Sequence, residues 1–496
     1  MSGTDYDVDT SLRERIAADP RPALVWAGGI VVLILLELGA LIQAVLTMVA
    51  SAMDFVPGDP GVTTLRSAAS DAGGIPTLLS REVIPNRGHM TGPDGPWVGT
   101  FPENLPMFDV GLEPMVAWTL RVVLIFLYNA LFFGWLFYGW STYRRHYRAA
   151  DWTPRDDVID RFRTHSWGLF GAIVVFLFLT MAVFAPALGT TTVQQNIEQP
   201  FSYQTKYFDE DSGEVESVAV GTANGQSASD GAGDSNVGPW QYDDFDRFHP
   251  VGTMADGVDL WTFMMGGARV SLFIGVFTIS IASFIAAGAA LMTGYYKGIV
   301  DLVVVVLGDS VMSVPQMLLL ILLSTVFADH WLGSIYNGGF IIALIFAFTT
   351  WPYLWRSIRG PSLQVASEEW VDAAKSYGQT PRKTMSKHML PYIVGYLLVY
   401  ASMSIGGIII GTSVLSFLGS GLGVTSPTPE WGRAIADGQN YIATQSWHVS
   451  MIPGVMIVLV VMGFNAFGDG IRDAIDPQSE GAEGSETTVV GGGGGG

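Results

Sequence analysis

Long apolar segments, interrupted by shorter polar ones, are the main feature of this sequence. No Lys, Arg, Asp or Glu occurs between Ser271 and Tyr296, nor between Ser310 and Ala328. An apolar run of about 18 or more residues is long enough to cross the hydrocarbon core of a bilayer as a helix. We therefore predict an all-α membrane protein with a polytopic helix bundle. The predicted spans are 23–50, 115–140, 166–188, 269–296, 300–328, 337–355, 391–418 and 450–468.

Two basic loops set the expected orientation of these spans. Residues 141–165 and 356–390 each carry six Arg or Lys side chains, and such clusters in short loops stay on the cytoplasmic side of a membrane. Four predicted spans separate the two loops, and an even number returns the chain to the same side. We expect a multi-pass protein of the cytoplasmic membrane with both termini in the cytoplasm. The basic residues are Arg144, Arg145, Arg148, Arg155, Arg161 and Arg163, then Arg356, Arg359, Lys375, Arg382, Lys383 and Lys387.

Acidic residues are concentrated outside the predicted spans. The chain has 45 Asp and Glu against 25 Lys and Arg, a net charge of −20. Residues 189–260, expected outside the cell, hold thirteen acids against Lys206 and Arg247. Such a surface can simply keep exposed parts soluble, but we favour adaptation to high salt, as in a halophilic archaeon. The Gly-, Ser- and Asp-rich centre of this loop, residues 212–238, predicts a flexible excursion and not a folded domain.

The residue types argue against several kinds of chemistry. The chain has no cysteine and seven dispersed histidines, so we expect no catalytic residues, no metal site and no cofactor in this chain. A phosphate loop of the form Gly-x-x-x-x-Gly-Lys-Ser/Thr is missing. Nucleic acid is an unfavourable partner because no basic face exists to bind phosphates. Two alternatives are an ion-coupled secondary carrier and a membrane-embedded hydrolase, although neither inverted halves nor a catalytic constellation is visible.

Three stretches, taken in chain order, carry a resemblance to a known family. The first contains His249-Pro-Val-Gly-Thr253, Gly257-Val-Asp259 and Gly267-Ala-Arg-Val-Ser-Leu272; the second is Glu369-Trp-Val-Asp-Ala-Ala-Lys-Ser-Tyr-Gly378 followed by His388-Met-Leu-Pro391; the third contains Ser416-Phe-Leu-Gly419, Pro427-Thr-Pro-Glu-Trp-Gly432 and Asn465-Ala-Phe-Gly-Asp-Gly-Ile-Arg-Asp-Ala-Ile-Asp-Pro477. Over residues 160–477 the chain resembles the permeases of dipeptide, oligopeptide and nickel importers of the ATP-binding cassette (ABC) transporter family. Three residues depart from the family's usual pattern: Met254 replaces Asp, Val258 replaces Arg and Asp372 replaces Glu.

The resemblance implies an organisation and a set of partners. Residues 1–150 would form an N-terminal extension with two membrane helices and an external loop. Residues 151–477 would form a six-helix permease core with the external acidic loop 189–260, and residues 478–496 a disordered tail. The expected partners are a homologous second permease, two ATPase subunits that bind ATP and Mg²⁺, and an extracellular solute-binding protein. This chain would not itself be an enzyme, and transport would proceed by alternating access.

The second stretch is similar to the EAA loop (residues 359–390), the cytoplasmic loop that docks on the ATPase in this family. The resemblance assigns this role to Glu369, Asp372, Ala373, Ala374, Gly378, His388, Leu390 and Pro391. The residues themselves predict a helix over 364–375, a left-handed turn at Gly378, and a second helix with Thr380 as N-cap and Pro381 at its first position. The alternative is an ordinary solvated linker, which has no need of this order of caps and breakers.

One carboxylate, Asp309, lies within the predicted span 300–328. A charge at membrane depth is unfavourable and normally faces protein or water, so Asp309 is a candidate residue of the translocation path. The alternative is a structural carboxylate near the cytoplasmic end of the helix, bonded to a neighbouring helix or to Lys297. We favour the structural role because only about two helical turns separate Asp309 from Asp301 at the expected membrane edge. Pro315 predicts a kink in the same span.

Overall fold

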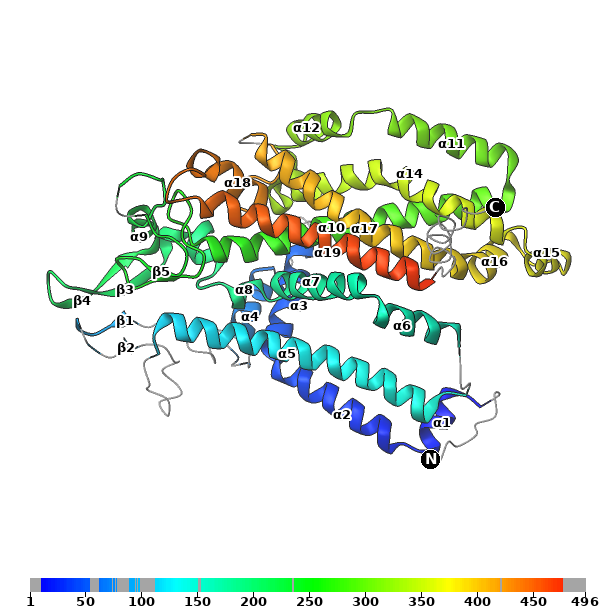
Figure 1. Cartoon of the computed structure of the whole chain (residues 1–496), viewed down its shortest axis with the longest axis horizontal. Coiled ribbons are helices and arrows are strands. Elements are labelled where there is room, and N and C mark those ends of the chain that lie inside the picture. Colours follow the sequence, from blue (N-terminus) through cyan, green and yellow to red (C-terminus); the bar gives the residue numbers. More distant parts are fainter. Residues whose placement is uncertain are drawn as a thin grey trace, which may run out of the picture. The chain divides into compact units, whose positions relative to one another are not determined.

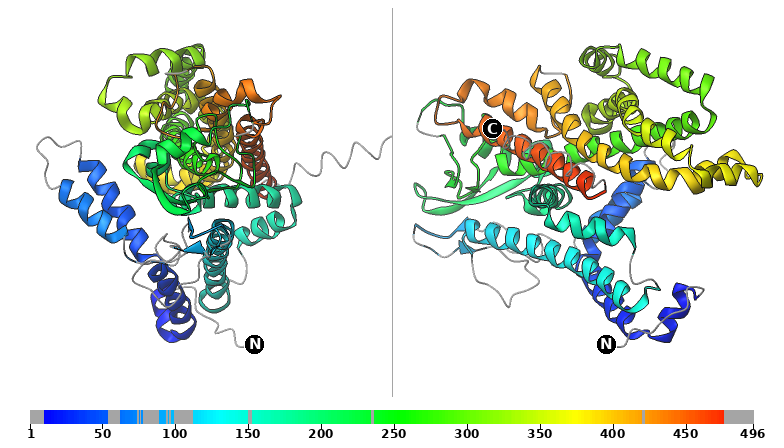
Figure 2. Two further views of the ribbon diagram at one scale, coloured as in Figure 1. Left: turned by 90° about the vertical axis from the view of Figure 1, so that its left-hand side faces the viewer. Right: turned by 45° about the vertical axis from the view of Figure 1, so that its right-hand side comes forward.

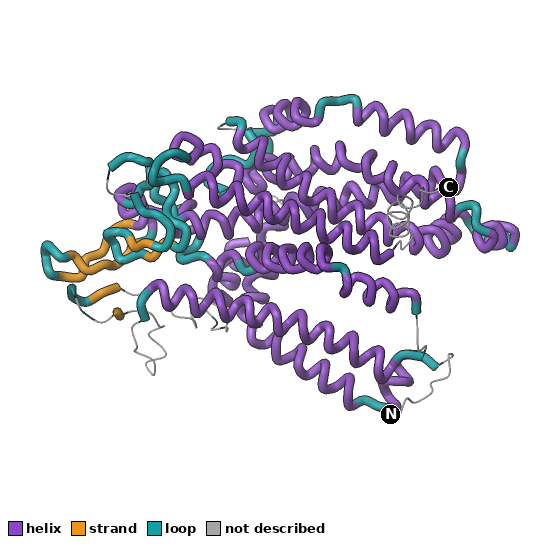
Figure 3. Tube along the Cα trace, viewed as in Figure 1, coloured by secondary structure: helices purple, strands orange, loops and turns teal. Residues whose placement is uncertain are grey.

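The computed structural model of the chain describes residues 10–53, 62–73, 75, 77, 89–93, 95, 97–98, 112–149, 153–233, 236–419 and 422–475. The predicted tail at 478–496 and most of residues 54–112, within the predicted N-terminal extension, lie outside these residues. The chain divides into two compact units. Unit 1 comprises Met1–Thr153 and Phe184–Thr262, and unit 2 comprises Pro154–Val183 and Phe263–Gly496. Helices dominate both units, and the described strands all belong to unit 1 (Figures 1 and 3).

The six predicted core spans correspond to helices of unit 2. Its elements are α6 (Pro154–Thr164), α7 (Ser166–Val183), α10 (Leu260–Tyr296), α11 (Gly298–Met312), α12 (Gln316–Val326), α13 (Trp331–Ser334), η5 (Ile335–Gly338), α14 (Gly339–Val365), α15 (Glu369–Ser376), α16 (Pro381–Thr384), η6 (Met385–Met389), α17 (Leu390–Phe417), α18 (Trp431–Gly438), η7 (Gln439–Tyr441) and α19 (His448–Ile475). The segments that contain α7, α10, α14, α17 and α19 are each long and apolar enough to cross a membrane. The remaining span consists of α11 and α12, bent by 74° (Figure 2).

Proline explains the break between α11 and α12, and the predicted kink is confirmed. Pro315 precedes α12 with an extended backbone (φ −63°, ψ 109°). It has no N–H to donate to the preceding turn, and its ring disfavours a helical residue before it. The next residue, Gln316, donates from Nε2 to Oγ1 of Thr349 in α14 at 2.7 Å. A polar contact to a neighbouring helix therefore holds the start of α12.

Small residues let the helices of unit 2 pack closely. A Cβ at Gly168 of α7 would lie 2.8 Å from the Cα of Gly470 in α19, so no larger residue fits at this crossing. Three alanines of α10 spaced four residues apart are fully buried: Ala282, Ala286 and Ala290. Helix association in membranes relies on close packing of this kind, because lipid tails are as apolar as the side chains. The unit-2 helices therefore form the packed bundle that the sequence predicts.

Unit 1 contains the N-terminal helices and three short two-stranded sheets. Its elements are α1 (Leu12–Ala18), α2 (Arg21–Leu36), α3 (Leu38–Met53), α4 (Val62–Gly73), β1 (His89–Met90), β2 (Trp97–Val98), α5 (Pro114–Thr142), η2 (Tyr143–Tyr147), α8 (Ala185–Leu188), η3 (Gln194–Glu198), η4 (Pro200–Ser202), β3 (Gln204–Asp209), β4 (Glu214–Ala219), α9 (Val220–Gln226), β5 (Gln241–Tyr242) and β6 (Phe248–His249). α5 and η2 form one candidate membrane span, Pro114–Tyr147. α2 packs on α5, where the indole N–H groups of Trp26 and Trp135 each donate to the other's backbone carbonyl at 3.2 and 3.0 Å.

The continuous span predicted at 23–50 is wrong in detail. The helix breaks at Glu37, between α2 and α3, where the backbone is not helical (φ −115°, ψ 14°). The Glu37 side chain is 6% exposed. An acidic group in the middle of the apolar run thus coincides with the break. The bent pair that passes as a candidate span is instead α1 with α2, at an angle of 100°. The predicted fold class, a polytopic helical membrane bundle with additional N-terminal helices, is nevertheless confirmed.

The flexible excursion predicted for residues 212–238 is also wrong. Residues 189–260, which we call the connecting segment, fold as part of unit 1. β3 and β4 form an antiparallel hairpin with partners from Gln204↔Ala219 to Asp209↔Glu214, and α9 follows directly (Figure 1). The Gly- and Ser-rich composition misled the prediction, because buried polar side chains hold the segment together along with buried apolar ones such as Phe245, Phe248 and Met254.

Candidate functional site

The EAA loop consists of two short helices joined by a tight turn. α14 ends at Val365 and α15 begins at Glu369, so the single helix predicted over 364–375 is interrupted. Glu368 has an extended backbone (φ −72°, ψ 142°) that starts a new helix in a different direction. Val371 and Ala374 of α15 are buried, at 0% and 7% exposure. These two side chains fasten α15 to the rest of unit 2.

A left-handed glycine ends α15, as the sequence predicts. Gly378 has φ +76°. Its N–H donates to the carbonyl of Lys375 at 2.9 Å, and the N–H of Gln379 donates to that of Ala374 at 3.1 Å. This pair of bonds satisfies the last carbonyls of the helix. A Cβ at Gly378 would meet no heavy atom within 4 Å, so the backbone conformation, and not packing, requires glycine here.

The second helix of the EAA loop begins where the sequence predicts. Thr380 occupies the N-cap position with an extended backbone, and Pro381 is the first residue of α16. The predicted cap is only partly confirmed, because the Thr380 side chain makes no capping hydrogen bond. α16 continues through η6 into α17, and together they form one helical segment, Pro381–Phe417. A displacement of the loop would therefore be passed directly to a candidate membrane span.

The structure places the predicted docking residues on this loop in different environments. Glu369, Asp372, Ala373 and Gly378 are exposed, whereas Ala374 packs inside the chain. Asp372 carries a local ion pair, with its Oδ1 3.2 Å from Nζ of Lys375. The loop therefore offers small and acidic side chains on its outer face. Their role in docking stays a prediction.

The C-terminal end of the EAA loop contacts the turn and α15. Nε2 of His388 lies 3.1 Å from Oε1 of Gln379, and its ring centroid lies 6.1 Å from that of Trp370. Leu390 and Pro391 begin α17. His388, Leu390 and Pro391 thus shape the loop and join it to α17, while the exposed face lies on α15 and the turn.

Two exposed aromatic residues of the EAA loop were not among the predicted site residues. The side chain of Trp370 is 44% exposed and that of Tyr377 is 90% exposed. Aromatic residues supply much of the binding energy in protein interfaces, so these two side chains are candidates for contact with a partner. The sequence could have pointed to these two residues, because they are aromatic in a loop that otherwise consists mainly of charged and small residues.

Asp309 has a partner on a neighbouring helix. The carboxylate of Asp309 in α11 pairs with the guanidinium of Arg356 in α14. The structural alternative named a neighbouring helix or Lys297 as the partner, and the neighbouring helix provides it. A second pair joins the same two helices, with Nε of Arg359 2.8 Å from Oδ1 of Asp301. Both groups of the Asp309 pair are about half exposed in this chain, at 53% and 46%. The geometry agrees with the structural role, and a role in the translocation path stays a prediction.

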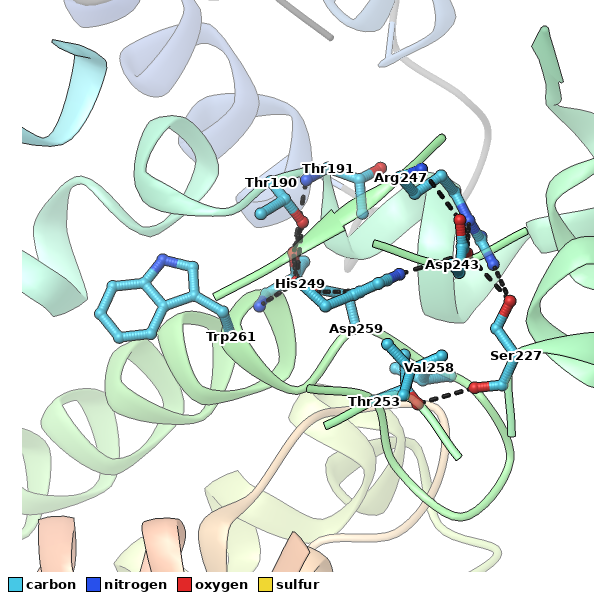
Figure 4. A network of polar contacts seen from close by, with 12 residues as sticks. Thr190, Thr191, Ser227, Asp243, Arg247, His249, Thr253, Val258, Asp259 and Trp261 are labelled. Carbon is cyan, nitrogen blue, oxygen red and sulfur yellow. Dashed lines mark hydrogen bonds and ion pairs between the residues drawn. The ribbon is translucent and has the colours of Figure 1, made fainter. Parts of the chain in front are cut away.

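A second polar site, which sequence reasoning missed, is buried in the connecting segment (Figure 4). Oδ2 of Asp243 accepts hydrogen bonds from Nε of Arg247 at 2.5 Å and from Oγ of Ser227 at 2.9 Å. Arg247 also donates to Oδ1 of Asn224 at 2.5 Å. Asp243 and Arg247 are 8% and 5% exposed. Arg247 is one of two basic residues among thirteen acids in the segment. This isolation could have identified it from the sequence as a candidate for a buried ion pair.

His249 extends this network to the start of α10. Its Nδ1 lies 2.8 Å from Oδ1 of Asp259, and its Nε2 lies 3.2 Å from Oδ2 of Asp243. Ionised carboxylates only accept, so both ring nitrogens must donate and the ring is an imidazolium. Asp259 in turn accepts from the N–H of Thr262 at 2.8 Å, which caps the first turn of α10. We call Asp243, Arg247, His249 and Asp259 the buried network.

The charges of the buried network stabilise one another. Burial by itself would lower the pKa of His249, but the hydrogen bonds and charges of Asp243 and Asp259 outweigh it and raise that pKa above its usual value. Burial would likewise raise the pKa of each aspartate, but the hydrogen bond and charge of His249, joined at Asp243 by the charge of Arg247, outweigh it and lower both pKa values. Buried charges persist only when paired in this way.

The two family departures in this segment lie next to each other. Met254 and Val258 are 2% and 9% exposed, and the N–H of Met254 donates to the carbonyl of Val258 at 2.8 Å. A charged side chain at either position would be buried. Apolar residues at both positions leave this turn with no buried charge to pair.

Comparison with known proteins supports a single family. Residues 263–480 match the family model of the binding-protein-dependent transport system inner membrane component. Residues 153–207 match the N-terminal TM domain of oligopeptide transport permease C. Residues 1–152 lie outside both matches.

Individual relatives agree with these matches. The dipeptide transport system permease protein of Alkalihalophilus pseudofirmus is 33% identical over 46% of this chain and 72% of its own length. A probable D,D-dipeptide transport system permease protein of Escherichia coli K12 is 32% identical over 47% of this chain and 75% of its own. A glutathione transport system permease protein of another Escherichia coli strain is 30% identical over 66% of this chain and 92% of its own.

The matched residues include both the helices of unit 2 and the EAA loop. The matched relatives are permeases of transport systems for peptides or peptide-like solutes. The apolar helices of unit 2 are those expected of a multi-pass inner membrane component. The chain therefore belongs to the family of inner membrane permease components of binding-protein-dependent transport systems, the ABC importers.

Proposed function

We propose that this permease carries dipeptides or other short peptides, and that its EAA loop docks on a separate ATPase. The observation that carries the proposal is the exposed face of α15 and its turn. Ala373, Trp370 and Tyr377 present small and aromatic surface there, on a loop continuous with a candidate membrane span. The names of the relatives support the peptide substrate.

The proposal includes a set of partners and an orientation. Two ATPase subunits bind ATP and Mg²⁺, a homologous second permease completes the pathway, and an extracellular solute-binding protein delivers the substrate. The EAA loop and both termini face the cytoplasm, because Lys and Arg gather in the loops at 141–165 and 356–390. Closure of the ATPase pair moves the loop, and alternating access follows as the helices change between outward-open and inward-open states.

Transport by the reconstituted complex tests this function. The complex is placed in proteoliposomes with the binding protein and an ATP supply, and uptake of a radiolabelled dipeptide is compared with uptake of its free amino acids. We expect dipeptide uptake that needs ATP and the binding protein and that survives collapse of ion gradients. Uptake that follows an ion gradient without ATP would instead support the ion-coupled carrier.

A variant of the loop separates docking from folding. Ala373→Arg adds a long charged side chain to the exposed face and should abolish ATP-driven uptake and co-purification of the ATPase. Ser212→Arg, at the exposed turn between β3 and β4, is the matched control and should leave both intact. Normal uptake by Ala373→Arg would show that α15 is not part of the docking surface.

We also propose that the protein works in high salt, as in a halophilic archaeon. The net charge of −20 supports this proposal, as do the exposed acids of the β3–β4 hairpin, which include Asp211, Glu214 and Glu216. Screening by salt reduces the repulsion between such carboxylates. The purified chain should therefore unfold at a higher temperature in molar KCl than in 0.1 M KCl, and a fall in that temperature would argue against the proposal.

A further inference from the structure

A small cavity lies beside the buried network, entirely within unit 1. Its volume is about 30 Å³, enough for a water-sized particle and far too small for a peptide. One wall is apolar and is formed by Pro114, Ala117 and Trp118 of α5 together with Val220 and Phe248. The other wall is polar. The polar lining residues are Arg121, Thr190, Thr191, Asn196, Arg247, His249 and Asp259.

The polar wall carries more positive than negative charge. Arg121 and Arg247 are always protonated in proteins, and His249 is an imidazolium because both of its nitrogens face carboxylates. Asp259 is the one carboxylate that lines the cavity among the described residues. Arg121 is 2% exposed and His249 is 2% exposed. Three buried cations and Asp259 therefore line this space, and Asp243 pairs with Arg247 and His249 from behind, so the group keeps one excess positive charge.

Both carboxylate oxygens of Asp259 already accept hydrogen bonds from the protein. Oδ1 faces Nδ1 of His249 at 2.8 Å. Oδ2 accepts from Oγ1 of Thr190 at 2.8 Å and from Oγ1 of Thr262 at 2.7 Å. The carboxylate of Asp259 thus bonds both to the buried network and to the first turn of α10.

A buried hydrogen-bond donor at the cavity has no partner. Asn196 is 1% exposed, and its Nδ2 makes no hydrogen bond to the described residues. The amide orientation is fixed, because its Oδ1 accepts from Nδ2 of Asn224 at 3.0 Å. A buried donor left without an acceptor costs about 1–3 kcal/mol. An acceptor in the cavity would remove this cost.

We propose that this cavity binds one halide ion, which would be chloride under natural conditions. A halide accepts a hydrogen bond from Asn196, fits the volume and partly neutralises the cationic wall. The role of this ion would be structural. Arg121 and Trp118 belong to α5, and they donate to the carbonyls of Gly189 at 3.0 Å and Leu188 at 3.1 Å. The ion would therefore tie α5, a helix of the N-terminal extension, to the connecting segment.

Thermal unfolding of the detergent-purified full chain tests the proposal. The unfolding temperature is measured in sodium chloride, sodium bromide and sodium gluconate at one ionic strength, so that general salt effects are equal. A ligand that binds only the folded state raises stability with the logarithm of its concentration. We expect the unfolding temperature to rise with chloride and bromide but not with gluconate. Equal unfolding temperatures in all three salts would show that the cavity holds water only and would overturn the proposal.

An isosteric variant identifies the site. Asn196→Asp keeps the acceptor for Asn224 and puts a carboxylate oxygen where the amide nitrogen was, so the protein supplies the negative charge itself. This variant should lose the halide dependence. Asn440→Asp makes the same charge change at an exposed position and should keep it. If Asn196→Asp does not fold, anomalous scattering from bromide-soaked crystals of the unaltered chain decides: a peak beside Asn196 supports the site, and its absence overturns it.

Discussion

The connecting segment and the EAA loop are both polar stretches between apolar helices, yet they use their polar residues in opposite ways. In the connecting segment, Asp243, Arg247 and His249 are buried and bonded to one another. In the EAA loop, Glu369 and Asp372 are exposed. The connecting segment thus uses these three charges to hold its own fold, whereas the two carboxylates of the EAA loop lie at the surface.

Two glycines show the same contrast. Gly257 and Gly378 have nearly equal backbone angles, with φ +79° and +76°. A Cβ at Gly257 would collide with the carbonyl oxygen of Asn224, whereas one at Gly378 would meet nothing within 4 Å. The conformation is therefore required at both positions, but close packing within the chain is found only at the first.

Breaking the buried network should have the largest effect on stability. Arg247→Met leaves the carboxylate of Asp243 buried without its main partner, which costs about 3–5 kcal/mol. The matched control is Lys206→Met, which removes the exposed basic residue of the same segment and should change stability by less than about 0.5 kcal/mol. Thermal unfolding of the purified chain measures both. Similar unfolding temperatures for the two variants would contradict the network's structural role.

A change at the EAA turn should affect transport more than stability. Gly378→Val puts a β-branched residue in the left-handed region, at a cost of about 1–2 kcal/mol, and should abolish ATP-driven uptake while membrane insertion persists. Gly378→Asn is the control, because Asn tolerates this conformation and the space around it is open. It should retain uptake. Normal uptake by Gly378→Val would show that the turn does not couple transport.

The pH dependence of stability should be the smallest effect and should distinguish the two regions. The raised pKa of His249 stabilises the connecting segment fully below the unfolded value of about 6.5, and this contribution is lost as the pH rises through the folded pKa. The lowered pKa values of Asp243 and Asp259 act above about 3.9 and lose their effect as the pH falls through the folded values. Stability should therefore be greatest between about pH 4 and 6.5.

The variant His249→Gln tests this assignment. Without the imidazolium, the decline in unfolding temperature on the alkaline side should be weaker. The matched control is His388→Gln in the EAA loop, where the ring faces an amide and no carboxylate, and its pH profile should follow that of the unaltered chain. An unchanged alkaline decline in His249→Gln would mean that another group titrates.

Features that depend on local backbone preferences were predictable from the sequence. The left-handed turn at Gly378, the helix start at Pro381 and the kink at Pro315 follow from the allowed angles of single residues. The apolar spans of unit 2 follow from their length and lack of charge. Each of these signals lies within a few residues of the structure that it specifies.

Features that depend on distant pairing were not predictable. Asp259 meets Thr190 across 69 residues of sequence, and Arg247 meets Asn224 across 23. Composition alone therefore pointed to a flexible segment where a folded one exists. The break at Glu37 was missed because hydropathy averages over a single acid. The exposure of Trp370 and Tyr377 could be recognised only once their neighbours were placed.

Cysteine labelling at Tyr377 tests most directly whether the EAA loop docks the ATPase on the cytoplasmic face. The chain has no cysteine, so Tyr377→Cys offers one thiol at a position that is 90% exposed. Ser212→Cys, in the exposed turn between β3 and β4, reports on the connecting segment, which we expect outside the cell. An impermeant thiol reagent should label Ser212→Cys in intact cells and Tyr377→Cys only in inside-out vesicles, and bound ATPase should protect the latter. Labelling of Tyr377→Cys in intact cells, or equal labelling with and without the ATPase, would contradict the account.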